Sequence, residues 1–268
     1  AVWPVSMEIY IPRFWDRPRD MECRARRQKA RMPKDAHHRE QWVMALDRIE
    51  QVRSMGFNPT NVYAGIGLGE EYRFRDGLDQ CGQGYIVEVP PTIEVFLDEP
   101  VLTEDISKQK KRGRPRKRHR RMDAEIPPVP VSKLFYGSQE NSWKPALVHR
   151  DLSVNSNTLN ASIRVWPAQG YRDGIVHEPV WLFCADNNAS TGTLGHRYYL
   201  TNDSRWLRTH DPDRINEACS LAHLCKQRMT DELGLLHHEG RSWIGWHRHV
   251  LLVFLAWAFL LEKDLSGK

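Results

Sequence analysis

The sequence has few cysteines, and their spacing excludes two common uses. Five cysteines, an odd number, occur in 268 residues, and no two of them form a Cys-x-x-Cys pair. A disulfide framework uses an even set in an oxidising compartment, and a structural zinc site uses closely spaced pairs. The twelve histidines match no zinc spacing either, so we predict free thiols and no metal ligand. The cysteines are Cys23, Cys81, Cys184, Cys219 and Cys225.

A long hydrophobic run and a secretory leader are also absent. The longest apolar run, residues 250–261, falls short of the ~20 residues that a membrane-spanning helix needs. The first residues, Ala-Val-Trp-Pro-Val-Ser-Met-Glu, have no basic n-region and no apolar h-region. We expect a soluble cytoplasmic protein without a membrane partner. The first residue is not methionine, which hints that the chain begins inside a longer gene.

Positive charge is concentrated in one run, although the formal net charge is only +5. Residues 108–121 hold ten Lys or Arg and no acid, which indicates a polyanionic partner; a solvated linker or a localisation tag has the same composition. Within the run, Arg112-Gly-Arg-Pro-Arg-Lys117 matches the core of an AT-hook, which lies in the narrow minor groove of A/T-rich DNA. We assign DNA-phosphate contacts to Lys108, Lys110, Lys111, Arg112, Arg114, Arg116, Lys117, Arg118, Arg120 and Arg121.

The first third of the chain has the pattern of an α/β layer. Residues 5–12 alternate and stop at a proline, which predicts a strand, and a basic stretch that favours no helix follows to Pro33. Apolar residues at helical spacing predict a helix over 37–55 that ends at Gly56. A strand at 62–64, a helix at 70–78 and a strand at 85–90 complete the pattern.

The rest of the chain changes character. Residues 91–205 carry the basic run, a proline-rich stretch and three alternating segments, at 162–166, 180–184 and 196–200, which predict strands. Asp211-Pro212 opens a predicted helix that reaches about Glu232. The last predicted helix, 243–262, is apolar nearly all round, so we expect it to be buried against the sheet.

Two blocks resemble a known family. Asp231-Glu-Leu-Gly-Leu-Leu, Gly240-Arg-Ser-Trp-Ile and the apolar end of the chain closely resemble the end of DDE transposases of the insertion sequence 701 branch. Val62-Tyr-Ala-Gly-Ile-Gly-Leu-Gly69 resembles that family's Val-x-Ala-Asp-x-Gly-Tyr-Gly pattern without a gap. The resemblance implies an RNase H-like mixed sheet with a β-rich insertion and C-terminal helices. It also implies three carboxylates that hold two Mg²⁺ ions for phosphoryl transfer on DNA.

This chain departs from the family at the acid positions. Gly65 stands where the second acid belongs, and glycine has no ligand atom. The third acid position is occupied by His223 in an ungapped alignment and falls in a deletion in a gapped one. Residues 5–12 resemble the family's third strand, so the first acid and the first two strands are missing. Glu70 and Glu71 are the nearest acids to Gly65, and we expect them to point elsewhere.

The resemblance predicts three regions and a function. Residues 1–96 form a partial RNase H-like core, 97–205 the basic linker and β-rich insertion, and 206–268 the C-terminal helices of the core. We expect a degenerate transposase fragment that binds DNA, has lost catalysis and needs no cofactor, in the bacterial cytoplasm at the nucleoid. A homodimer is a further expected partner. The alternatives are a repurposed DNA-binding protein and a nuclease that uses substitute acids.

Overall fold

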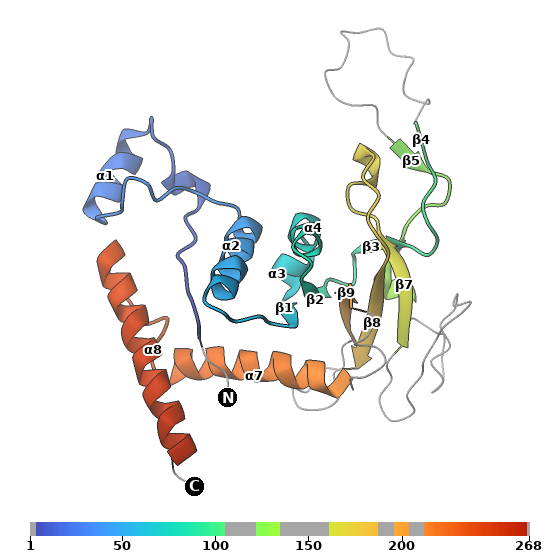
Figure 1. Cartoon of the computed structure of the whole chain (residues 1–268). Helices are drawn as coiled ribbons and strands as arrows, with labels where there is room; N and C mark the ends of the chain where they lie inside the picture. The colour runs from blue at the N-terminus through green and yellow to red at the C-terminus, as the bar shows by residue number, and fades with distance from the viewer. Residues whose placement is uncertain (1–3, 105–121, 135–160, 187–195, 204–211, 267–268) are drawn as a thin grey trace. The chain divides into compact units, whose positions relative to one another are not determined.

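The computed structural model describes residues 4–104, 122–134, 161–186, 196–203 and 212–266 (Figure 1). The chain divides into two compact units. We call Ala1–Asn58 with Asp213–Lys268 the helical unit, and Pro59–Pro212 the sheet unit. The basic run at 108–121 lies outside the described residues, so its assigned DNA contacts stay a prediction.

A seven-stranded mixed sheet forms the sheet unit, in the order β1-β2-β9-β8-β7-β3-β6. β1 and β2 are parallel, and the other neighbours in this sheet are antiparallel. A separate pair, β4 and β5, is also antiparallel. The strands are β1 (Asn61–Ala64), β2 (Gly84–Val89), β3 (Glu94–Phe96), β4 (Leu102–Glu104), β5 (Met122–Ala124), β6 (Val129–Pro130), β7 (Ala161–Pro167), β8 (Val180–Asp186) and β9 (His196–Thr201).

Strand β2 lies between β1 and β9 and is largely buried. On β2, Tyr85, Ile86, Val87 and Val89 are all buried, as expected for a strand covered on both faces. Two short helices, α3 (Ile66–Gly69) and α4 (Tyr72–Gln80), connect the parallel strands β1 and β2. Among the described residues of this unit, two further helical turns are α5 (Val131–Leu134) and η3 (Tyr171–Asp173).

The strands expected in a separate insertion belong to the same sheet. β2, from the expected core, pairs with β9, from the expected insertion, with Ile86 opposite Thr201 and Val89 opposite Tyr198. The α/β pattern and the expected strands at 62–64, 85–90, 162–166, 180–184 and 196–200 are therefore confirmed. The division into 1–96, 97–205 and 206–268 stays a prediction.

The start of the helical unit differs from the expectation in two ways. Residues 5–12 are not a strand, because an alternating segment becomes one only when a neighbour pairs with its backbone, and the described residues supply none. The stretch expected to be poor in helix contains η1 (Arg13–Trp15) and α1 (Met21–Lys29). Asp20 caps α1 by accepting hydrogen bonds from the Glu22 and Cys23 amides.

The other helices of this unit lie close to their expected places. They are α2 (Gln41–Ser54), α7 (Pro212–Asp231) and α8 (Trp243–Ser266). Gly56 after α2 has a φ of 90°, the left-handed conformation expected at a helix end. The expected burial of α8 against the sheet stays a prediction, and within the helical unit one face is covered. One face packs on the end of α7 through Cys225, Met229, Val250, Val253 and Trp257. Leu252 and Phe259, on the other face, are 64% and 65% exposed.

α8 is also the one helix of the described residues that is long and apolar enough to cross a membrane, judged by length and composition alone. The expectation from the sequence counted only residues 250–261, whereas the helix begins earlier, at Trp243. One such helix is weak evidence, since a helix of a soluble protein meets the same criteria.

Candidate active site at the end of strand β1

Gly65 directly follows β1, at the carboxyl end of the parallel pair β1–β2. Its φ of −78° and ψ of 177° are extended values that any residue can adopt. Its carbonyl oxygen accepts hydrogen bonds from the Leu68 and Gly69 amides, at 3.1 and 2.9 Å, and so starts α3. A Cβ added to Gly65 meets no atom within 4 Å. Neither the backbone nor the packing requires glycine here.

Gly69, four residues later, is a different case. A Cβ at this position would overlap the carbonyl group of Glu88 on β2, and it would also press on the Val87 side chain. Because the neighbouring atoms belong to a paired strand, they cannot move aside at low cost. Gly69 is therefore a packing requirement, whereas Gly65 leaves open space for a Cβ.

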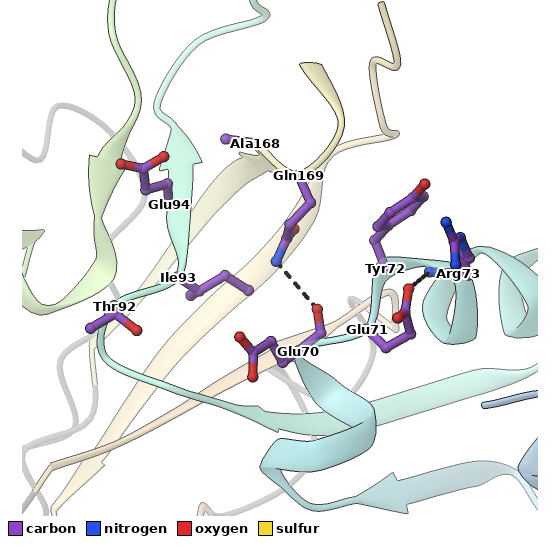
Figure 2. Close-up of a pocket in the computed structure, with 9 residues that line it drawn as sticks. All are labelled: Glu70, Glu71, Tyr72, Arg73, Thr92, Ile93, Glu94, Ala168 and Gln169. Carbon is purple, nitrogen blue, oxygen red and sulfur yellow. Dashed lines mark hydrogen bonds between the residues drawn. The ribbon is translucent and has the colours of Figure 1, made fainter. Parts of the chain in front are cut away.

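A pocket of about 400 Å³ lies beside this turn (Figure 2). The start of α4, the start of β3 and the end of β7 contribute its walls. Two carboxylates, those of Glu70 and Glu94, lie along it, and Glu71 instead turns to accept a hydrogen bond from the Arg73 amide at 3.2 Å. The lining residues are Glu70, Glu71, Tyr72, Arg73, Thr92, Ile93, Glu94, Ala168 and Gln169.

A buried cation holds one wall of the pocket in place. Arg75 is 3% exposed and donates hydrogen bonds to the Gly69 carbonyl oxygen and, at 2.8 Å, to Oε1 of Gln169. Burial lowers the pKa of its guanidinium group, and the nearby Tyr85, Asp76, Asp79 and Glu71 act in the opposite direction. The pairing fixes Gln169, whose Nε2 lies 3.5 Å from the Glu70 carbonyl oxygen.

His177 makes a second connection between the same two segments. Its Nε2 lies 2.7 Å from the Gln169 carbonyl oxygen, and its Nδ1 lies 3.1 Å from Oδ1 of Asp76 on α4. The side chain is 7% exposed, and its ring lies against Tyr72 with centroids 5.3 Å apart. Arg75 and His177 together tie α4 to the loop after β7, which gives the pocket a fixed shape.

Comparison with known proteins identifies the family of the chain. A model of the DDE superfamily endonuclease family matches residues 1–153, more than half of the chain. The chain belongs to the DDE superfamily endonuclease family. No curated protein matches the chain. The matched residues include Gly65, the pocket residues of α4 and β3 and the basic run, whereas the C-terminal block lies beyond them.

Membership in this endonuclease family relates the chain to transposase-type DNA cleavage and makes DNA a plausible partner. The catalytic chemistry of such enzymes requires carboxylates gathered around metal ions, because Mg²⁺ prefers anionic oxygen ligands. No group of three or more His, Cys, Asp or Glu that could hold a metal is found in the part of the chain that the structure describes. Glu70 and Glu94 are two donors along one pocket, so these residues do not fit a two-metal site.

The two positions at which the family pattern is broken lie in different units. Gly65 belongs to the sheet unit, and His223 belongs to α7 of the helical unit. Several residues that shape the pocket were not predicted from the sequence. Glu94, Gln169 and His177 lie in short segments without periodicity, and Arg75 is a charged residue that composition would place at the surface.

Proposed function

We propose that this chain is a transposase-derived protein of the insertion sequence 701 branch that binds DNA and does not cleave it. The observation that carries the proposal is Gly65. It occupies the aligned acid position at the end of β1, in a conformation and a space that would accept aspartate. Because the fold does not demand glycine there, its presence is a loss of a ligand and not a structural constraint.

The rest of the proposal extends the resemblance. The fold is an RNase H-like mixed sheet with a β-rich insertion and C-terminal helices, and the third acid position holds His223 or falls in a deletion. Such a chain is a degenerate transposase that needs no metal ion, acts at the nucleoid of a bacterial cytoplasm and pairs with a second copy. A repurposed DNA-binding protein that kept the basic run has the same molecular activity.

One observation favours a competing function. Glu70 and Glu94 lie along the same pocket, beside the turn where the family places an acid (Figure 2). Two carboxylates that share one Mn²⁺ could support slow nicking through a single metal ion. This nuclease interpretation requires Glu70 for activity, and the first proposal does not.

The deciding experiment is a native gel of the purified 268-residue chain with a labelled duplex, Mn²⁺ and a salt series. We expect a shifted band that weakens with salt, without nicked product. Nicking that a chelator and Glu70→Ala both abolish would overturn the proposal in favour of the nuclease. Glu71→Ala is the matched control, because it removes the adjacent carboxylate that caps α4. Gly65→Asp alone should restore no nicking, since one carboxylate does not complete the donor set.

A further inference from the structure

The helical unit carries positive charge that the sequence analysis left unassigned. Residues 13–34 hold nine Lys or Arg against three acids. Each acid is engaged locally. Asp16 accepts hydrogen bonds from His37 and the His38 amide, Asp20 caps α1, and Glu22 lies 4.0 Å from Arg26. These acids therefore leave most of the positive charge of the segment unneutralised.

Helix α1 is held in the unit by one face only. Cys23 and Ala30 on this face are 1% and 8% exposed. Arg27 lies between them and donates hydrogen bonds to the carbonyl oxygens of Trp15, Pro33 and Ala36. Because residues three, four and seven apart share a helix face, the cations at other positions of α1 are directed away from this anchor.

Six cations of this segment are exposed, and their side chains make no hydrogen bond or ion pair with any residue in the described ranges. Four of them are arginines, whose planar guanidinium groups bind phosphate through two parallel hydrogen bonds. Like charges gathered on one surface without counter-charges raise its affinity for a polyanion. The six, together the α1 basic surface, are Arg17, Arg19, Arg24, Lys29, Arg31 and Lys34.

The end of α1 meets a second basic segment. The Trp243 amide, at the start of α8, donates a hydrogen bond of 2.8 Å to the Ala30 carbonyl oxygen. Arg31 follows Ala30 and Arg241 precedes Trp243 by two residues, so this bond brings the two arginines into one neighbourhood. Arg241 is exposed as well. The positive surface thus extends from α1 to the start of α8 within the helical unit.

We propose that the α1 basic surface binds the phosphate backbone of duplex DNA, as a contact separate from residues 108–121. The proposal rests on the proposed function, that the chain binds DNA. A lipid surface is a poorer fit, because a membrane-bound helix presents a wide apolar face, whereas the exposed side of α1 carries Arg24, Ala25, Gln28 and Lys29, with Met21 as its one large apolar residue. Phosphate contacts carry no sequence information, so this surface adds affinity without selectivity.

The test compares two double variants of the full chain. Arg24→Gln with Lys29→Gln removes two cations of the surface, and Lys133→Gln with Arg164→Gln removes two exposed cations of the sheet unit. Binding to two duplexes of unrelated sequence is measured by fluorescence anisotropy over a salt series. The first variant should reduce the slope of log affinity against log salt by about 2, since each lost phosphate contact removes about 0.9. The second should leave the slope within the error of the wild-type chain.

Equal losses in both variants, or no loss in the first, would overturn the α1 basic surface while leaving DNA binding itself intact. A wild-type chain that binds neither duplex would overturn both this inference and the proposed function. Loss of binding to phosphatidylserine vesicles without loss of duplex binding would assign the surface to lipid. A lysine-acylation footprint on the wild-type chain tests the same surface without a variant that could misfold. Bound duplex should slow acylation of Lys29 and leave acylation of Lys133 unchanged. Equal reactivity of Lys29 with and without duplex would contradict the proposal.

Discussion

At the residue scale, the two glycines of the turn after β1 differ in whether their neighbours leave room for a side chain. Gly65 and Gly69 belong to the same short motif, yet only Gly69 is constrained by its neighbours. The resemblance predicts that Gly65 stands at the acid position, because the flanking residues fix the alignment. It could not distinguish a glycine that the fold requires from one that it tolerates, because that difference depends on the distance to β2, a strand fifteen residues or more away in the chain.

The two glycines therefore predict opposite effects of substitution. Gly65→Asp should leave the free energy of unfolding unchanged or raise it by up to about 1 kcal/mol, because the new residue restricts the unfolded chain and fits the native backbone. Gly69→Ala should lower it by about 1–3 kcal/mol, because its methyl group overlaps β2. Urea denaturation of both variants measures this. A loss at Gly65 as large as that at Gly69 would show that the space beside Gly65 is not available.

Asp16 predicts a pH dependence in the helical unit. The hydrogen bond from the His38 amide, together with that from His37, lowers the pKa of this carboxyl below 3.8 in the folded state, and partial burial offsets this. A carboxyl whose pKa is lower in the folded than in the unfolded state stabilises the fold above about pH 3.8, and this contribution disappears as the pH falls through the folded-state value. Asp16→Asn should thus lower the free energy of unfolding by about 1–2 kcal/mol at pH 7, and by less in acid.

Urea denaturation of the wild-type chain and Asp16→Asn between pH 7 and pH 3 measures whether the difference in their free energies of unfolding becomes smaller in acid. Asp47→Asn is the control, because it removes a carboxylate that pairs with Arg39 at the surface and whose side chain is 49% exposed. The control should cost less than about 1 kcal/mol at pH 7. A difference between wild type and Asp16→Asn that stays constant down to pH 3 would contradict the role given to Asp16.

At the scale of elements, the sequence predicted the buried strands well and α1 not at all. β2, β8 and β9 are rich in apolar and β-branched or aromatic residues and are buried by their neighbours, so composition and position agree. Cys23 is the one buried residue within α1. Because its other residues are mostly arginines and polar residues, the sequence shows no apolar residues repeating at helical spacing. For residues 5–12 the opposite happened: the alternating pattern predicted a strand, and none forms because alternation alone does not supply a pairing partner.

The N-cap of α1 offers a direct test of this element. Asp20→Ala should lower the stability of the helix by about 1 kcal/mol and speed hydrogen exchange at the Glu22 and Cys23 amides, which lose their acceptor. Glu22→Ala removes a first-turn acid that is 80% exposed and makes only a 4.0 Å pair, so it should change stability by less than about 0.5 kcal/mol. Equal exchange rates in the two variants would argue against the cap.

At the scale of the whole molecule, two sets of cations fall in the sequences of two different units. Residues 17–34 belong to the helical unit, and residues 108–121 fall within the range of the sheet unit. From the sequence we assign DNA contacts only to the continuous run. The α1 basic surface is interrupted by acids along the chain, and these acids contact groups other than the six cations of that surface.

Two linked DNA contacts on one chain predict additive losses of salt dependence. Replacing residues 108–121 by a Gly-Ser linker of equal length should reduce the salt slope, and adding Arg24→Gln with Lys29→Gln should reduce it by about a further 2. Because each contact holds the other near the DNA, the combined variant should lose more affinity relative to wild type than either parent variant does. Anisotropy titrations of the four proteins measure both the salt slope and the affinity.

Replacing residues 146–159, a stretch of equal length and no net charge, by the same linker controls for the linker itself. A combined variant with the slope of the linker variant alone would mean that α1 contacts the duplex only when residues 108–121 are present, which makes the two sets of cations one site.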